Sequence, residues 1–151
     1  MVHAAGPVES VLLMRRSQRE GDPWSGHWSF PGGRREPGDA DLIDTALREL
    51  GEECGVDLSR QQLERAFPIR HAGQYMGQLM LVAPFLFRVP QAFAVTPDGV
   101  EAEEAIWFPL ATLREAGARH GFGVEEVGEF LLDGERVSSS LVREALGRGD
   151  L

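Results

Sequence analysis

Apolar runs alternate along the chain with loops rich in glycine, proline and aspartate. The pattern predicts a helix from about Asp41 to Cys54, with Asp39 or Asp41 as N-cap and Gly55 as C-terminal stop. A short helix is expected over 110–119 and another after the serines at 138–140. Strands are predicted over residues 8–14, 63–69, 78–89, 101–108 and 129–132, the third apolar enough to be central in a sheet. Strands and helices interleave without linker or repeat, so we expect one α/β domain over residues 1–151.

The stretch "RELGEECGV", residues 48–56, lies on the first helix. At helical spacing Glu49, Glu52 and Glu53 share one side, away from an expected buried stripe made of Ile43, Leu47, Leu50 and Cys54. Like charges so spaced repel by a few tenths of a kcal/mol per pair. Gly51 in the same turn costs roughly 1 kcal/mol relative to alanine. The sequence therefore contains two unfavourable features within nine residues.

Two interpretations of this acidic turn are open. It is either a solvated acidic face, in which Arg48 pairs with Glu52 four residues later, or a site for a hard divalent cation. Mg²⁺ is held in proteins by a few carboxylates together with water and substrate phosphates. In the second case Gly51, which has no side chain, would let another backbone pack close to the turn.

Composition excludes several classes of function. The net charge of −9 argues against a duplex-binding surface, which needs clustered Lys and Arg. No apolar run reaches the roughly 18 residues of a membrane span, and the first residues lack a signal-peptide pattern. Cys54 is the single cysteine, so an internal disulfide is excluded and a reducing compartment is favoured. We expect a cytoplasmic protein whose partners are neither nucleic acids nor membranes.

The acidic turn resembles the signature of the Nudix hydrolases, G-x5-E-x7-R-E-φ-x-E-E-x-G-φ with φ aliphatic. The second half matches completely, through Arg48, Glu49, Leu50, Glu52, Glu53, Gly55 and Val56. In the first half, Asp39 stands in place of glutamate after Gly33, and eight residues instead of seven precede Arg48. The resemblance implies a Nudix α/β fold, with a mixed β-sheet sandwiched between α-helices.

The same resemblance assigns roles within the motif. It implies that Glu49, Glu52 and Glu53 bind Mg²⁺ or Mn²⁺ and take part in catalysis. Asp39 and Arg48 would pair and brace the loop, and Gly55 would be structural. Further along, "EAEEAIWFPLATL" from residue 101 resembles the family's strand and loop ending in Trp-x-Pro-Leu. Glu101 or Glu104 would then be an additional metal ligand or the general base, the alternative being an ordinary solvent-facing glutamate.

A second set of motifs resembles the coenzyme A diphosphatases within this family. These are "LLMRRS" at 12–17, "FPGG" at 30–33 and "TALRE" at 45–49. Gly21 stands where that motif has an arginine, and the spacing to Gly26 is one residue longer. The resemblance implies coenzyme A or its thioesters as substrate. Arg16, Arg34 and Gly33 would contact its phosphates, since arginine offers a bidentate fork to them; ordinary surface arginines are the alternative.

The tail, residues 113–151, is atypical. Its last part resembles the Ser-Ser-x-x-x-Arg segment of bacterial FAD synthetases, but the upstream His-x-Gly-His of those enzymes is missing. A helix capped by Ser138 or Ser139 is the structural alternative. Three interpretations of the tail stay open: a native Nudix terminus, a truncated one, or a foreign segment.

Taken together, the sequence predicts a divalent-metal-dependent hydrolase that cleaves the diphosphate linkage of a nucleoside diphosphate derivative. Its partner would be this small-molecule substrate, and whether the chain forms a homodimer stays open. A catalytically silent Nudix-like nucleotide sensor is the first alternative. A fragment of a nucleotidyltransferase, indicated by the tail alone, is the second.

Overall fold

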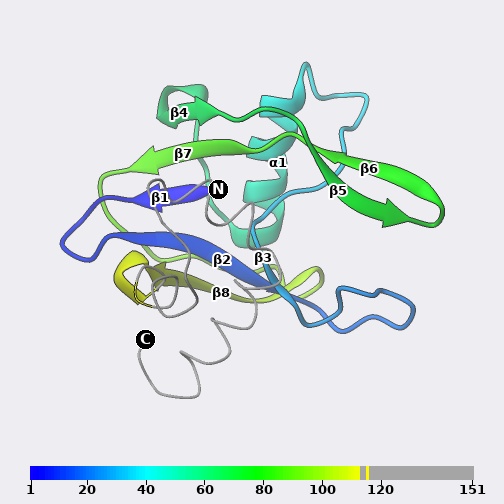
Figure 1. Cartoon of the computed structure of the whole chain (residues 1–151). Helices are drawn as coiled ribbons and strands as arrows, with labels where there is room; N and C mark the ends of the chain where they lie inside the picture. Colours follow the sequence, from blue (N-terminus) through cyan, green and yellow to red (C-terminus); the bar gives the residue numbers. More distant parts are fainter. Residues whose placement is uncertain (113–114, 116–151) are drawn as a thin grey trace.

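A computed structural model of the chain describes residues 1–112 and Glu115. In this part of the chain a six-stranded sheet lies against one α-helix, and a two-stranded hairpin extends to one side (Figure 1). The sheet has the order β3-β2-β1-β7-β4, and β8 pairs with β2. Strands β1 and β7 are parallel and the other pairs antiparallel. The predicted α/β class with a mixed sheet is therefore confirmed. The bounds are β1 Val2–Ala4, β2 Ser10–Arg16, β3 Trp28–Ser29, β4 Leu63–Ala66, β7 Phe85–Val89 and β8 Ala102–Pro109.

Strand β2 is the central element of the sheet. It pairs with β8 from Ser10 opposite Pro109 to Arg16 opposite Ala102, and it also pairs with β1 and β3. Successive side chains of a strand point to opposite faces. All four residues from Val11 to Met14 are buried, so the sheet is covered on both faces here.

The helix α1, Leu42–Cys54, forms where the sequence predicts it. The Asp41 side chain caps its start by accepting hydrogen bonds from the amides of Ile43 and Asp44, both at 3.0 Å. Gly55 ends it in the left-handed conformation, with φ of 65°. Leu50 and Cys54 pack into the core beside Leu12 and Met14 of β2. Of the expected stripe, Ile43 and Leu47 are only half-buried.

The prediction of one central strand over 78–89 is wrong. The chain forms two strands there, β6 Gln78–Val82 and β7, separated by Ala83 and Pro84. Proline cannot donate to a strand ladder, which explains the break. In the same way the strand expected over 63–69 ends at Ala66, and β5, Arg70–Tyr75, begins after Pro68. Strands β5 and β6 form the separate hairpin, and β6 is exposed instead of central.

Smaller differences concern short elements. The first predicted strand is shifted by two residues, to β2, and the fourth, predicted over 101–108, is β8. Strands β1 and β3 were not predicted, because three and two residues are too short for a pattern to emerge. A short 3-10 turn, η1, spans Arg60–Gln62. Residues 110–112 are helical, as expected.

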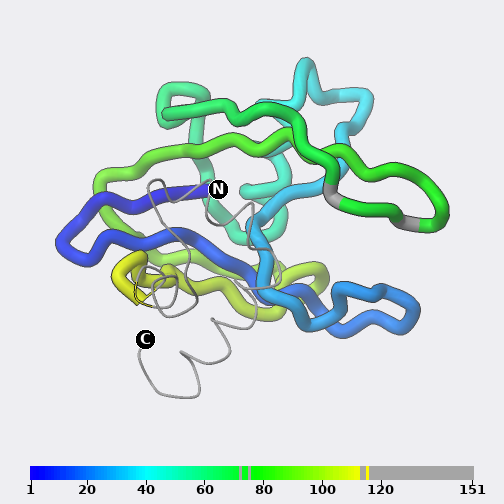
Figure 2. Tube along the Cα trace, viewed as in Figure 1, coloured from blue at the N-terminus to red at the C-terminus, as the bar shows by residue number. Residues whose placement is uncertain are grey.

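The remaining predictions for 113–151 lie outside the described residues. Among the described residues, no helix is long and apolar enough to cross a bilayer. The tube in Figure 2 shows that the β5–β6 hairpin and the loop between β2 and β3 both extend toward the right of the view.

Candidate active site

The irregular loop between β3 and α1, residues 30–41, is fixed to the helix by Asp39 and Arg48. Arg48 donates from Nε to Asp39 Oδ1 at 3.0 Å and from Nη2 to Asp39 Oδ2 at 3.1 Å. Asp39 also accepts from the Thr45 hydroxyl and the Glu36 amide, both at 2.9 Å. The hydrogen bonds from Arg48 hold the pKa of the buried Asp39 carboxyl well below its usual range. Although Asp39 is shorter than glutamate and the loop is one residue longer, Asp39 thus makes the contact with Arg48 that the motif implies.

Arg48 also faces the acidic side of α1. Its Nη1 lies 3.0 Å from Glu49 Oε1 and 3.0 Å from Glu52 Oε2. Burial raises the pKa of Glu49; Arg48 opposes this shift, while the charges of Glu52 and Glu101 add to it. The Arg48 guanidinium therefore hydrogen-bonds three carboxylates, with Glu36 Oε1 3.8 Å from Nη1 as a fourth, and negative charge exceeds positive charge around it.

Glu53 is the least solvated of these acids, although the sequence placed it off the buried stripe. It is only 2% exposed. The loops on either side of the helix cover it, since Gly32 N donates to Glu53 Oε2 at 2.8 Å and Asp98 N donates to the Glu53 carbonyl at 3.0 Å. Burial raises the pKa of Glu53 to about 8; the Gly32 amide opposes this, and Glu49 and Glu101 raise it further. A positive charge at this position would therefore be strongly favourable.

Near the acidic turn, close approach of another group occurs at Gly33 and Gly55 and not at Gly51. A side chain at Gly33 would collide with the carboxylate of Glu49, so this loop position must be glycine for Glu49 to lie where it does. A Cβ at Gly55 would lie 3.1 Å from Thr96 O. At Gly51 it would meet only Val56 O, at an ordinary 3.7 Å. The expectation of a backbone packed closely against Gly51 is thus wrong.

The structure distinguishes between the acids near the start of β8. Glu104 Oε1 lies 2.5 Å from Arg15 Nη2 on the adjacent strand, and Glu103 Oε2 lies 3.1 Å from the same nitrogen. Glu101, in contrast, is connected to the end of α1, since Asp98 accepts from its amide and donates to the Glu53 carbonyl, and its charge raises the pKa of both Glu49 and Glu53. Of the two candidates Glu101 and Glu104, the structure brings Glu101 to the acidic turn.

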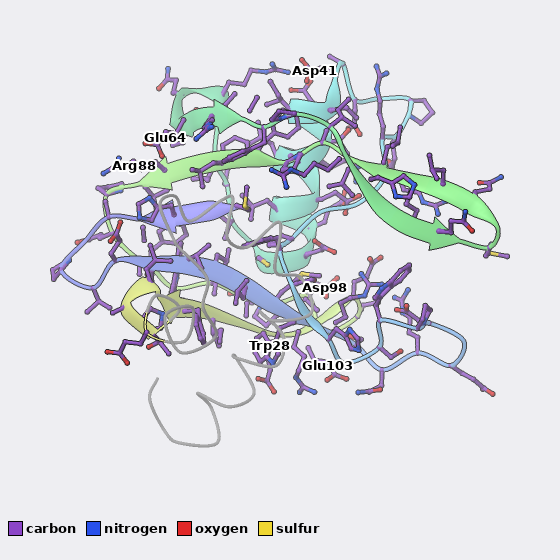
Figure 3. All side chains as sticks on the ribbon, viewed as in Figure 1. Trp28, Asp41, Glu64, Arg88, Asp98 and Glu103 are labelled. Carbon is purple, nitrogen blue, oxygen red and sulfur yellow. The ribbon has the colours of Figure 1, made fainter. Side chains whose placement is uncertain are left out.

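Asp98 holds Glu101 in place, and sequence reasoning missed it. Its Oδ1 accepts from the amides of Val100, Glu101 and Ala102, each at 2.9 Å. Figure 3 shows Asp98 beside the C-terminal end of α1. The Pro-Asp-Gly sequence at 97–99 is a turn signal that could have indicated this role, because aspartate side chains bind the amides that follow them.

The two arginines expected to contact phosphate differ in their surroundings. Arg16 Nη2 pairs with Asp22 at 3.0 Å, and the charge of Arg16 lowers the pKa of Glu53, so Arg16 is close enough to act on this acid. Its Nε is buried without a hydrogen-bond partner, as is the neighbouring Ser17 hydroxyl. Arg34 is exposed, and its carbonyl accepts from Arg48 Nη2 at 2.9 Å.

The carboxylates of Glu49, Glu52 and Glu53 are of the chemical kind that binds a hard divalent cation, but they do not converge on one point. In the described part of the chain, no three His, Cys, Asp or Glu side chains are grouped closely enough to hold a metal ion. The reason is that Arg48 binds both Glu49 and Glu52, whereas Glu53 turns to the Gly32 amide. Carboxylate oxygens are nevertheless the ligands that Mg²⁺ and Mn²⁺ prefer. The buried Glu53, with its raised pKa, supplies the negative charge that a cation would neutralise.

Comparison with known proteins agrees with this geometry. A family model described as "NUDIX domain" matches residues 4–125. An uncharacterised protein of Schizosaccharomyces pombe is 38% identical over 112 residues, which cover 70% of this chain and 33% of that protein. The mitochondrial coenzyme A diphosphatase NUDT8 of Homo sapiens is 34% identical over 111 residues, covering 70% of this chain and 44% of that protein. The chain therefore spans less than half the length of either relative.

A solved structure supports the fold. The NUDIX domain of Shewanella oneidensis NrtR, complexed with ADP ribose, is similar with a TM-score of 0.58 at 20% sequence identity. The similarity covers 76% of this chain and 71% of that one.

Proposed function

The chain belongs to the Nudix family, and we propose that it is a divalent-metal-dependent diphosphatase acting on a nucleoside diphosphate derivative. The observation that carries this proposal is the acidic turn of α1, where buried Glu53 and the partly buried Glu49 face Glu101. Burying this much negative charge lowers stability unless a cation or a proton compensates. Such a cost is typical of a functional site.

Glu49, Glu52 and Glu53 would hold the divalent ion. When bound, Mg²⁺ or Mn²⁺ would neutralise the charge of the diphosphate oxygens and activate water for attack on phosphorus. The excess of carboxylates over the single Arg48 guanidinium favours this assignment.

The other residues would orient the substrate and move the proton. Glu101 is the proposed proton acceptor, because Asp98 fixes its backbone and Arg15 engages Glu104 instead. Arg16 would donate to phosphate oxygens from a side chain already anchored by Asp22. Arg34 and the backbone of Gly33 would contact the substrate from the loop opposite Glu49.

Coenzyme A or one of its thioesters is the proposed substrate. The support comes from "LLMRRS" with "FPGG" and "TALRE", and from the similarity to proteins named coenzyme A diphosphatases. Addition of one water across the P–O–P linkage breaks one P–O bond and leaves two phosphate monoesters. For coenzyme A these are 3′,5′-ADP and the phosphopantetheine part.

The test is incubation of the purified chain with Mg²⁺ or Mn²⁺ and, separately, coenzyme A, an acyl thioester, ADP-ribose and a nucleoside triphosphate. Products are then identified by mass. We expect 3′,5′-ADP from coenzyme A and no product once a chelator is added. Turnover of ADP-ribose while coenzyme A stays intact would contradict the proposed substrate but not the proposed diphosphatase activity. Saturable binding without turnover of any compound would support the nucleotide sensor instead.

A further inference from the structure

The β5–β6 hairpin is a sheet of only two strands. It pairs antiparallel from Arg70 opposite Val82 to Tyr75 opposite Gln78, and it extends away from the main sheet (Figure 1). A two-stranded hairpin is at best marginally stable in water unless a further strand or another element covers it. The hairpin continues the β4–β7 pair, with the Phe67 amide donating to the Pro84 carbonyl at 2.9 Å between them, so its base is anchored while among the described residues no third strand pairs with β5 or β6.

Strand β6 is apolar and yet exposed. Its sequence is Gln-Leu-Met-Leu-Val, and Leu79, Leu81 and Val82 are 58%, 63% and 37% exposed. Ile69 before the hairpin and Met76 at its tip are 61% and 86% exposed. Leu79 and Leu81 share one face of the strand, and exposed apolar side chains close together in this way usually mark an interaction site.

The two strands differ in how their edges are protected. Strand β5 begins with Arg70, and its register shifts between His71 and Gln74 around Gly73, whose φ is 91°. Charges and bulges of this kind prevent pairing with another strand. Strand β6 contains no charge, proline, glycine or bulge. Its outer edge is therefore the one suited to accept a strand.

The charge pattern indicates which partner supplies that strand. The chain has a net charge of −9, but no aspartate or glutamate occurs from Arg65 to Pro97. Arg70 is the one arginine of the hairpin strands, and it lies on β5; two copies that meet through β6 therefore keep these charges on their outer strands, whereas the acidic surface elsewhere would oppose contact. A twofold axis places the same strand of both copies side by side and antiparallel.

We propose that this chain forms a homodimer through β6. The two β6 edges pair across a twofold axis and give a continuous four-stranded sheet with the order β5-β6-β6-β5. Pairing satisfies the outer backbone groups of β6 and brings Leu79 and Leu81 of the two copies into cross-strand contact. The interface does not depend on the catalytic proposal.

The first test measures the mass of the full chain by light scattering and sedimentation over a wide concentration range. The wild type should be a dimer. Leu79→Lys combined with Leu81→Lys should weaken dimerisation at least about 100-fold, because charge on an edge strand opposes pairing. Val8→Lys is the matched control, since Val8 is 63% exposed outside the hairpin, and it should remain dimeric.

A second test does not depend on disrupting the strand. Cysteines are placed singly at positions 79, 80 and 81, and also at Val8 as control; the native Cys54 is buried. Under oxidation, a disulfide-linked dimer should form from the variant of the β6 series whose cysteine lies on the twofold axis and therefore pairs with its own copy, and not from the Val8 variant, because paired Cα atoms across antiparallel strands lie within disulfide reach. A wild type that is monomeric throughout would overturn the proposal. So would a dimer that the lysines leave unchanged, or a β6 series without cross-links.

Discussion

The acidic turn of α1 and the β5–β6 hairpin show opposite relations between charge and burial. At the turn the carboxylate of Glu53 is buried and that of Glu49 partly buried, so charged groups lose contact with water. In the hairpin, Leu79 and Leu81 are apolar and exposed. Both arrangements reduce the stability of the isolated chain, one by desolvating charge and the other by hydrating apolar surface. In our two proposals both would become favourable when a partner binds, a cation in the first case and a second copy in the second.

The two regions also differ in how firmly they are held. Hydrogen bonds from Arg48, Thr45 and the Glu36 amide converge on Asp39, and three amides converge on Asp98. In the hairpin, the strands β5 and β6 pair with one another, and the Gly73 amide donates to His71 Nδ1 at 3.3 Å. We therefore expect substitutions at the turn to alter activity with small effects on folding, and substitutions in the hairpin to alter assembly or local stability.

The largest expected effect is that of Glu53→Gln. The amide keeps an oxygen that can accept from Gly32 N but removes the buried charge. Turnover should fall by about 100-fold or more, because the charge that binds the divalent ion is lost. In the absence of metal the melting temperature at neutral pH should rise, because the pKa of about 8 means that Glu53 must take up a proton on folding, a cost that the neutral amide avoids. Turnover and melting curves with and without Mg²⁺ measure both effects.

Glu64→Gln is the control for this change. Glu64 is exposed and pairs with Arg88 at 3.0 Å, far along the chain from the turn. Glu64→Gln also converts a glutamate to its amide, and it should leave turnover and the stabilisation by Mg²⁺ at the wild-type level. If Glu53→Gln retained full turnover and full stabilisation by Mg²⁺, the acidic turn would be a buried structural feature and not the centre of an active site.

A second, smaller effect is expected from Gly33→Ala. The added methyl group would displace the carboxylate of Glu49, whose flexible side chain can move aside at little cost in stability. Turnover should fall about 10- to 100-fold, since misplacement of a catalytic group by about 1 Å is costly. Gly38→Ala in the same loop is the control, because a Cβ there meets no atom within 4 Å. Equal activity of the two variants would show that the position of Glu49 does not matter.

The third prediction concerns Asp98, which connects the helix end to Glu101. Asp98→Ala removes the acceptor of three amides and should lower kcat about 10-fold with little change in KM, because Glu101 loses its fixed position. Asp98→Asn keeps one acceptor oxygen and should restore most of the activity. Asp41→Ala, which removes the cap at the other end of α1, controls for general destabilisation. A loss of kcat in this control equal to that of Asp98→Ala would make Asp98 a purely structural residue.

The sequence predicted the helix α1 better than it predicted the sheet, for a physical reason. The N-cap Asp41, the stop Gly55 and the acidic positions between them follow from local spacing, and the structure contains them. Burial of Glu53 could not be predicted this way, because the groups that cover it come from loops at Gly32 and Asp98. The break between β6 and β7 was missed because the apolar run outweighed the single Pro84 within it. Local sequence patterns thus determine where a helix begins and ends, while contacts between distant segments determine which side chains are buried.

The smallest expected effect sharpens the description of the hairpin. Met76 and Gly77 form its two-residue turn with φ of 51° and 75°, and a left-handed conformation is unfavourable for methionine. Met76→Asn gives the Asn-Gly pair that suits such a turn and should stabilise the hairpin by about 0.5–1 kcal/mol. Because Met76 is 86% exposed at the tip, turnover should not change. Amide hydrogen exchange of β5 and β6 measures the effect, which should be slower exchange there and unchanged exchange in α1. Faster exchange in the hairpin would mean that the methionine side chain itself stabilises the turn, through a contact that asparagine cannot make.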